Sequence, residues 1–138
     1  MRVIALDIGE KRIGIAAGDT ASGIAMPVCV LPAGEVTSGA RTWRRVLEDE
    51  EPELIVAGLP VTLGGESGPQ ARRVRASAQA IADAAGLPFE FADERLSSAE
   101  AKRVLRERGL SEREMRGRLD AVAASLVLES WLASHAEP

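Results

Sequence analysis

The 138-residue sequence is poor in cysteine, histidine and aromatic residues. A single cysteine, Cys29, excludes an internal disulfide, and its apolar neighbours predict a small buried thiol. Tyr is absent and aromatic residues make up 3% of the chain, which argues against a surface on which nucleic-acid bases stack. The only histidine, His135, lies near the C-terminal end, so the sequence offers no cluster of His and Cys that would favour zinc.

Long hydrophobic runs are missing too. No apolar stretch reaches the length of a membrane span, and Asp7 lies too close to the first residue for the layout of a signal peptide. We therefore predict a cytoplasmic protein that makes no contact with a membrane. The length, with 46% apolar and 28% charged residues, is typical of one globular domain, here residues 1–138.

The chain also lacks an excess of basic residues. Its net charge of -4 argues against a general nucleic-acid binder. The charges are nevertheless unevenly distributed, because residues 101–118 hold seven basic and three acidic residues, whereas residues 48–53 are almost purely acidic. The basic stretch suits a polyanion, although a solvated helix face with ion pairs is the simpler interpretation.

Apolar periodicity predicts an α/β fold with a mixed sheet. Three short apolar runs separated by turns, at residues 3–6, 13–17 and 26–31, predict an antiparallel meander of three strands. Two further strands are predicted at residues 54–60 and 89–92. Helices are predicted at residues 37–51 with a hydroxyl N-cap from Thr37 or Ser38, at 69–85, from a capping box at 97–100 up to Gly109, and at 119–134. Because helices connect the later strands, the meander should be extended by parallel strands.

Functional sites of such sheets lie at the carboxyl ends of the parallel strands, and carboxylate residues occur at these positions in the sequence. Asp7 follows the first apolar run, and Asp93 and Glu94 follow the fifth. Neighbouring strand residues point to opposite faces, so only one of Asp93 and Glu94 can face Asp7, and we favour Glu94 for its longer reach. The simpler interpretation of Asp7 is an Asp that ends a strand and bonds to the amides of a turn.

Asp120 stands at the start of the last predicted helix. Its helix face is otherwise apolar and rich in small residues, namely Ala123, Ala124, Val127 and Trp131. Small side chains would let this helix lie close to the sheet. A first-turn Asp that interacts with the helix dipole is the simpler interpretation.

These carboxylates, if they converge, need a counter-charge. Two of them roughly 5 Å apart, at an effective dielectric constant of about 20, repel by about 3 kcal/mol. Either one carboxyl stays protonated or a divalent cation binds, and oxygen ligands favour Mg²⁺ or Mn²⁺. Two such ions can activate a water and stabilise the leaving oxygen during hydrolysis of a phosphodiester.

Four segments follow one another along the chain: ALDIGEKRIGIAAGD, GLPVTLGGESGPQARRVR, FADERLSSAEAKRVL and LDAVAASLVLESWL. Together they resemble the YqgF/RuvX family of pre-16S rRNA nucleases, also called Holliday junction resolvase-like proteins. The resemblance implies a ribonuclease H-like fold, with a five-stranded mixed sheet flanked by helices. It further implies a metal-dependent endonuclease of the bacterial cytoplasm that matures the 5′ end of 16S rRNA.

The same resemblance assigns roles to residues of this sequence. Asp7, the acid of the DER segment (Glu94, with Asp93 as the alternative) and Asp120 become the catalytic, metal-binding carboxylates. Lys11 and Arg12 become phosphate contacts.

The chain departs from the family pattern at two places, which concern loop contacts to the substrate and leave the carboxylates unchanged. It has Thr62 and Gly64 where the family often has Asn and Asp, and Gly18-Asp19 where Ser-Asp is usual.

Two more arginines are candidate substrate contacts. Arg72 follows a Gly-rich loop and the predicted helix start at Pro69, an arrangement that can hold a phosphate, although a flexible connection explains the glycines equally well. Arg95 adjoins Glu94, where a local ion pair that orients the carboxylate is the simpler role.

Four functions remain to be compared. The first is a metal-dependent endonuclease that acts on structured RNA, with pre-16S rRNA and ribosomal precursor particles as partners and a monomer or homodimer as the active form. The second is a resolvase of branched DNA. The third is a non-cleaving nucleic-acid or ribosome-binding module. The fourth, an ATPase of the actin or sugar-kinase type, is disfavoured because such enzymes close two domains of this kind around a nucleotide.

Overall fold

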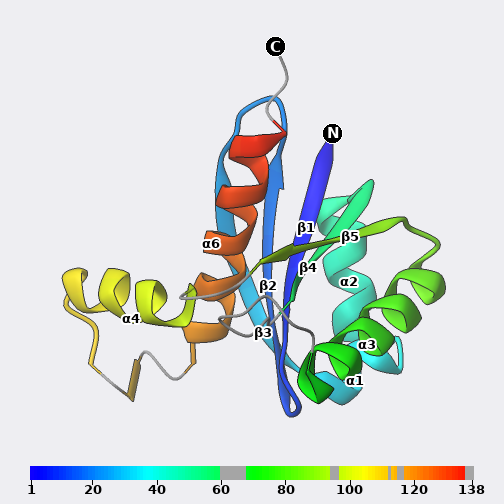
Figure 1. Cartoon of the computed structure of the whole chain (residues 1–138), viewed down its shortest axis with the longest axis horizontal. Coiled ribbons are helices and arrows are strands. Elements are labelled where there is room, and N and C mark those ends of the chain that lie inside the picture. Colours follow the sequence, from blue (N-terminus) through cyan, green and yellow to red (C-terminus); the bar gives the residue numbers. More distant parts are fainter. Residues whose placement is uncertain (60–67, 94–96, 112, 115–116, 136–138) are drawn as a thin grey trace.

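The computed structural model describes residues 1–59, 68–93, 97–111, 113–114 and 117–135. Five strands form one sheet in the order β3-β2-β1-β4-β5 (Figure 1). They are β1 (Arg2–Ile8), β2 (Arg12–Asp19), β3 (Ala25–Pro32), β4 (Leu54–Leu59) and β5 (Phe89–Asp93). The pairs β1–β2 and β2–β3 are antiparallel, and β1–β4 and β4–β5 are parallel. The predicted mixed sheet is confirmed.

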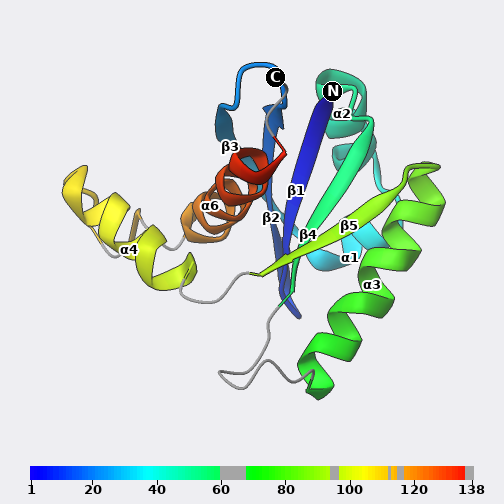
Figure 2. The same cartoon turned by 45° about the horizontal axis from the view of Figure 1, so that its top comes forward.

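Helices cover both faces of this sheet. They are α1 (Ala33–Thr37), α2 (Arg41–Glu50), α3 (Pro69–Ala85), α4 (Ser97–Glu107) and α6 (Leu119–Ser134). Helix α6 lies on one face, α1, α2 and α3 lie on the other, and α4 extends away from the sheet beside α6 (Figure 2). None of the described helices is long and apolar enough to cross a membrane.

Strand β1 is buried on both faces, which explains its uninterrupted apolar run. Val3 and Ala5 pack against α6 in one hydrophobic cluster. Ile4 and Leu6 pack in the other cluster, on the side of α1, α2 and α3. The alternation assigns each position of β1 to a face and so fixes the side on which a polar residue of this strand emerges.

The predicted helix at residues 37–51 is wrong at its start, because two helices occupy this stretch. Helix α1 begins directly after Pro32, and Ser38 is its C-cap rather than the N-cap of the next helix. Gly39 then adopts φ +70°, a left-handed conformation that ends a helix and that glycine adopts at little cost. Helix α2 consequently begins only at Arg41, with Ala40 as an N-cap that makes no side-chain hydrogen bond.

Cys29 is half-buried in β3 rather than fully buried. Burial raises the pKa of its thiol, and the nearby Glu50 carboxylate adds to the rise. The thiol is therefore protonated at neutral pH.

Candidate functional site

Asp7 lies near the carboxyl end of β1 and inside the strand rather than after it, since β1 continues to Ile8. It follows Val3 and Ala5 in the alternation, so it belongs to the face that α6 covers. Asp7 is half-buried, and its partner in the β1–β2 register is Gly14. Asp7 is thus an acidic residue near the end of β1, as predicted, and it belongs to the side of α6.

Asp120 is the second residue of α6, as predicted. Its carboxylate Oδ2 accepts a hydrogen bond from Nε of Arg12, the first residue of β2, at 3.1 Å. The two side chains form an ion pair, with 25% of Asp120 and 63% of Arg12 exposed. The start of α6 is thereby joined to the same end of the sheet that carries Asp7.

Gly14 accounts for the close approach of α6 to β2. A Cβ atom built at Gly14 would overlap the backbone carbonyl group of Asp120, so only a residue without a side chain fits there. Because Gly14 is also the register partner of Asp7, the two carboxylate residues flank the same glycine. The structure therefore brings Asp7 and Asp120 together at one point, from segments that are far apart in the sequence.

The third predicted acid falls at the limit of the described residues. Asp93 is the last residue of β5 and pairs with Leu59 of β4, which places it at the edge where the parallel strands end. Glu94 and Arg95 lie outside the described residues. In β5, Glu90 accepts a hydrogen bond from Trp131 of α6 at 3.4 Å between Nε1 and Oε1, whereas Phe91 packs beside α3 residues.

The predicted basic residues lie on both sides of this end of the sheet. Lys11 is exposed in the turn between β1 and β2, and Arg72 is exposed in the first turn of α3. Arg12 is the member of this group that contacts a predicted carboxylate, as described above. Arg73, next to Arg72, forms an ion pair with Glu10 of the β1–β2 turn.

With this arrangement in view, comparison with known proteins identifies the family. Residues 1–134 match the sequence model of the family described as "RuvX: Holliday junction resolvase". The chain belongs to the RuvX family.

Two curated relatives illustrate how far the similarity of this RuvX chain extends. A protein named "Putative pre-16S rRNA nuclease" from Anaeromyxobacter sp. (strain Fw109-5) is 42% identical over 132 residues, which cover 96% of each chain. A protein of the same name from Thermosynechococcus vestitus is 38% identical over 130 residues, which cover 94% of this chain and 86% of that one. The similarity thus extends over nearly the whole sequence.

Solved structures establish the ribonuclease H-like fold of the RuvX chain. Thermus thermophilus RuvC in complex with a Holliday junction substrate has a TM-score of 0.55 at 18% identity, covering 97% of this chain and 95% of that one. The Fowlpox virus resolvase in complex with Holliday junction DNA also has a TM-score of 0.55, at 11% identity, covering 97% and 98%. At these identities the likeness concerns the fold alone.

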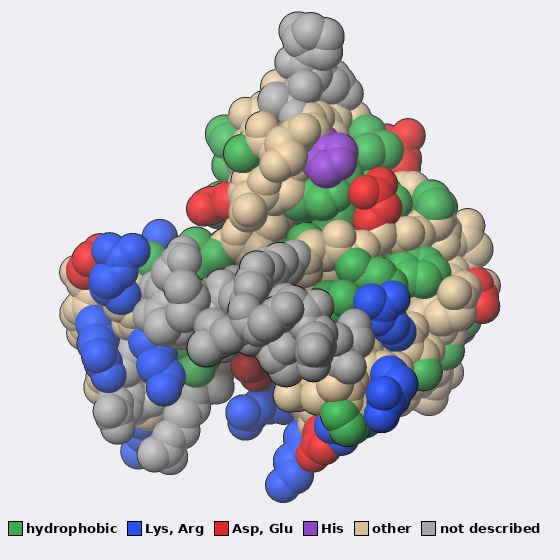
Figure 3. All heavy atoms as spheres, viewed as in Figure 1, with side chains coloured by type: hydrophobic (Ala, Val, Ile, Leu, Met, Phe, Trp, Pro, Cys, Tyr) green, Lys and Arg blue, Asp and Glu red, His purple; other side chains and the backbone are tan. Residues whose placement is uncertain are grey.

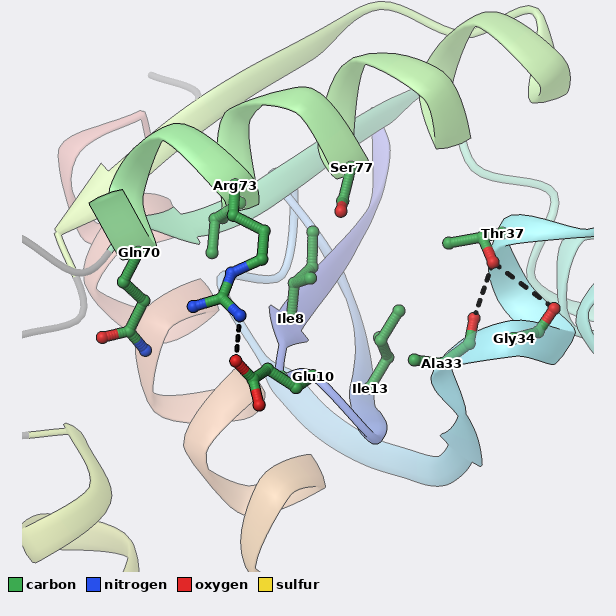
Figure 4. A pocket seen from close by; sticks show the side chains of 11 residues that line it. Ile8, Glu10, Ile13, Ala33, Gly34, Thr37, Gln70, Arg73 and Ser77 are labelled. Carbon is green, nitrogen blue, oxygen red and sulfur yellow. Dashed lines mark hydrogen bonds and ion pairs between the residues drawn. The ribbon is translucent and has the colours of Figure 1, made fainter. Parts of the chain in front are cut away.

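A pocket of about 450 Å³ lies in the RuvX chain on the face opposite Asp7, between the β1–β2 turn, α1 and α3 (Figure 4). Arg73 and Glu10 point toward one another across it and neutralise each other's charge. The Thr37 hydroxyl donates to the Ala33 carbonyl oxygen at 3.1 Å and is occupied within α1. This pocket is therefore separate from the carboxylates and contributes no ligand to them.

Sequence reasoning missed the role of Gly14 in this RuvX site. The signal was present, since a glycine inside an apolar strand often marks the close approach of another backbone. The Arg12–Asp120 and Arg73–Glu10 ion pairs gave no comparable signal, because nothing in a single sequence specifies which distant charges meet.

Proposed function

We propose that the protein is a metal-dependent endonuclease that hydrolyses phosphodiester bonds in structured nucleic acid, and that its role in ribosome biogenesis is 5′-end maturation of pre-16S rRNA. The observation that carries this proposal is the meeting of Asp7 and Asp120 beside Gly14, at the edge where the parallel strands end. The names of the curated relatives support the rRNA substrate.

The donor chemistry of the site fits Mg²⁺ or Mn²⁺. Asp7 and Asp120 supply carboxylate oxygens, the ligands that these hard cations prefer. Within the described residues no group of three or more acidic, His or Cys side chains lies close enough to hold a metal ion, so the third ligand of the proposal falls on the DER segment. We assign it to Glu94, because the even-numbered residues of β5 are the ones that meet α6. Asp93 is the alternative.

Each residue has a defined task in this proposal. Asp7, Glu94 and Asp120 hold one or two divalent cations, which when bound supply an activated water and stabilise the leaving oxygen. Arg12 neutralises Asp120 before the cation binds and contacts a substrate phosphate afterwards. Lys11, Arg72 and Arg95 hold further phosphates, so the substrate is oriented by its backbone.

A cleavage assay with matched variants tests the proposal. Precursor 16S rRNA is incubated with the parent, Asp7→Asn and Asp120→Asn, in Mg²⁺, Mn²⁺ or EDTA. Asp49→Asn, an exposed Asp of α2, is the control for loss of one negative charge. We expect cleavage by the parent and by Asp49→Asn in either metal, and none by the site variants or in EDTA. Cleavage that persists in EDTA, or in Asp7→Asn, would contradict the proposal.

A resolvase acting on branched DNA is the second candidate, because the description of the matching family names that activity. A four-way DNA junction in the same assay distinguishes it from an rRNA nuclease. Symmetric cuts in the junction without cleavage of the rRNA precursor would favour the resolvase. Tight binding of either substrate without any metal-dependent cleavage would favour a non-cleaving binding module.

A further inference from the structure

Helix α4 carries a basic face that the proposed site does not use. Its apolar residues Ala101 and Leu105 pack on Val122 and Ala123 of α6. Lys102, Arg103 and Arg106 occupy the exposed part of the helix, and Lys102 and Arg106 are four residues apart on one side of it. We call these three residues the α4 basic face.

The fold itself makes little use of these charges. Among the residues that the structure describes, neither Lys102 nor Arg106 has an ion-pair partner. Like charges at this spacing repel and destabilise a helix. Arg103 approaches Glu107 at 3.8 Å between Nη1 and Oε1, with both side chains about two-thirds exposed, an ion pair of little strength. Stability of α4 therefore does not explain the basic face.

The position of α4 relates this face to the carboxylates. Helix α4 packs on the part of α6 that directly follows Asp120, on the face of the sheet that also carries Asp7. Helix α3, with Arg72, lies on the other face and begins at the same end of the sheet (Figure 2). Figure 3 shows Lys and Arg side chains on both sides of this end of the molecule. A nucleic-acid backbone that crosses this end of the sheet near Asp7 would thus have basic residues on either side.

The densest run of acidic residues in the sequence lies at the other end of β1. The segment that ends α2 and leads into β4 contains Glu48, Asp49, Glu50, Glu51 and Glu53. Glu50 and Glu53 contact Arg2 at the amino end of β1, whereas Asp7 lies at its carboxyl end. Part of the net negative charge of the chain therefore lies away from the end that carries the carboxylates.

The aromatic residues indicate which form of nucleic acid fits. Trp43 and Trp131 are 2% and 6% exposed. Phe89 and Phe91 contact each other edge to face, and the Arg75 guanidinium lies over the Phe91 ring at 5.2 Å. With both Trp rings buried and both Phe rings half-buried against neighbours, the four aromatic side chains of the chain offer little ring surface for stacking of single-stranded bases. The protein is therefore expected to contact the phosphates of its substrate, which a base-paired segment exposes while its bases are stacked inside the helix.

We propose that the α4 basic face binds the sugar-phosphate backbone of a base-paired segment of the substrate, next to the phosphodiester that the carboxylates act on. The location beside the cut rests on the proposed function, whereas the binding of backbone phosphates by α4 does not. Helix α4 then contacts the duplex on the face of the sheet that α6 covers, while Arg72 of α3 contacts it on the opposite face.

Salt-dependent binding tests this inference. The probes are a labelled RNA hairpin stem and a single strand of similar length. The test protein carries Lys102→Gln, Arg103→Gln and Arg106→Gln together, and a second variant carries only the first and third changes. The control is Arg41→Gln with Arg44→Gln and Arg45→Gln, three exposed arginines of α2. Both triple variants lose three positive charges from one exposed helix.

We expect the parent to prefer the stem. The α4 triple variant should bind the stem about tenfold or more weakly, and its plot of log K against log salt should be less steep by about two to three, since each lost phosphate contact removes about 0.7–0.9 from the slope. The double variant should lose about two-thirds of this difference in slope, and the α2 variant should bind like the parent. An α4 triple variant with the affinity and slope of the α2 variant would overturn the inference.

Parallel measurements keep this result separate from the proposed function. Asp7→Asn should bind the stem with the same dependence of log K on log salt as the parent, and it should fail to cleave precursor 16S rRNA. If Asp7→Asn cleaves, the proposed function is overturned, while weak binding by the α4 variant still supports phosphate contacts on α4. Parent cleavage together with unchanged binding by the α4 variant overturns only the role of α4.

Discussion

Arg12 and Asp120 form an ion pair although they lie 108 positions apart in the chain. Their contact is partly exposed, and such pairs contribute about 0–1 kcal/mol to stability. A cation that binds Asp120 can therefore displace the guanidinium at little cost. The displaced Arg12 is then available for a phosphate, so binding of metal and binding of substrate become linked through one side chain.

The first prediction concerns this exchange. Arg12→Gln should bind Mn²⁺ a few-fold more tightly than the parent, because Asp120 no longer has a competing partner, and it should bind substrate more weakly. Calorimetric titration with Mn²⁺ measures the affinity. Arg2→Gln, which removes the ion pair with Glu50 at the opposite end of β1, is the matched control and should leave Mn²⁺ affinity unchanged. Equal Mn²⁺ affinities of Arg12→Gln and the parent would refute the exchange.

The sequence indicated Asp7 and Asp120 because each follows a recognisable signal, an apolar strand in one case and the start of a helix in the other. It could not indicate that Arg12 meets Asp120, because the partner of a long flexible side chain is decided by tertiary packing. The choice between Asp93 and Glu94 stays a prediction, because Glu94 lies outside the described residues.

At the scale of elements, the approach of α6 to β2 determines whether the site forms. The alanine-rich face predicted for α6 is part of this contact, since Ala124, Val127 and Trp131 pack on the sheet. Strand β2 contributes Gly14 and Gly18, and a Cβ at Gly18 would approach the Leu132 and Leu128 side chains of α6 to 3.0 and 3.1 Å. Small residues on both elements let the helix axis lie close to the strand.

The second prediction tests this contact. Gly14→Ala should lower the free energy of unfolding by about 1–3 kcal/mol or more, because the added methyl group overlaps backbone that cannot move without shifting α6. Urea unfolding measures the change. Gly34→Ala in α1 is the control, because no atom lies within 4 Å of its added Cβ, and it should be neutral or stabilising by about 0.4–1 kcal/mol. A Gly14→Ala protein as stable as the parent would show that α6 does not depend on this glycine.

Element boundaries were predictable where strong local signals mark them. Helix α3 runs from Pro69 to Ala85 and helix α4 begins at Ser97, as the proline start and the capping box indicated. The short helix α1 was missed, because its five residues carry too few apolar positions to show a periodicity. The hydroxyl of Ser38 was consequently misinterpreted as the start of α2.

At the scale of the whole molecule, a bound cation should stabilise the folded chain. Metal that binds only the folded state adds RT ln(1 + [metal]/Kd) to the free energy of unfolding, about 2.7 kcal/mol at a concentration one hundred times Kd.

The third prediction therefore concerns the melting temperature. Mn²⁺ should raise the melting temperature of the parent and of Asp49→Asn by several degrees, and that of Asp7→Asn by much less. Differential scanning calorimetry at increasing Mn²⁺ provides the comparison, with EDTA as the reference. A parent whose melting temperature is indifferent to Mn²⁺ would contradict the metal site.

The acidic run near the amino end of β1, opposite the basic residues of α3 and α4, contributes an electric dipole along the sheet. In the field of a long polyanion such a dipole experiences a torque that turns its basic end forward during approach. Collisions would then occur preferentially in the productive orientation, and this steering would fade as added salt shortens the Debye length below about 10 Å.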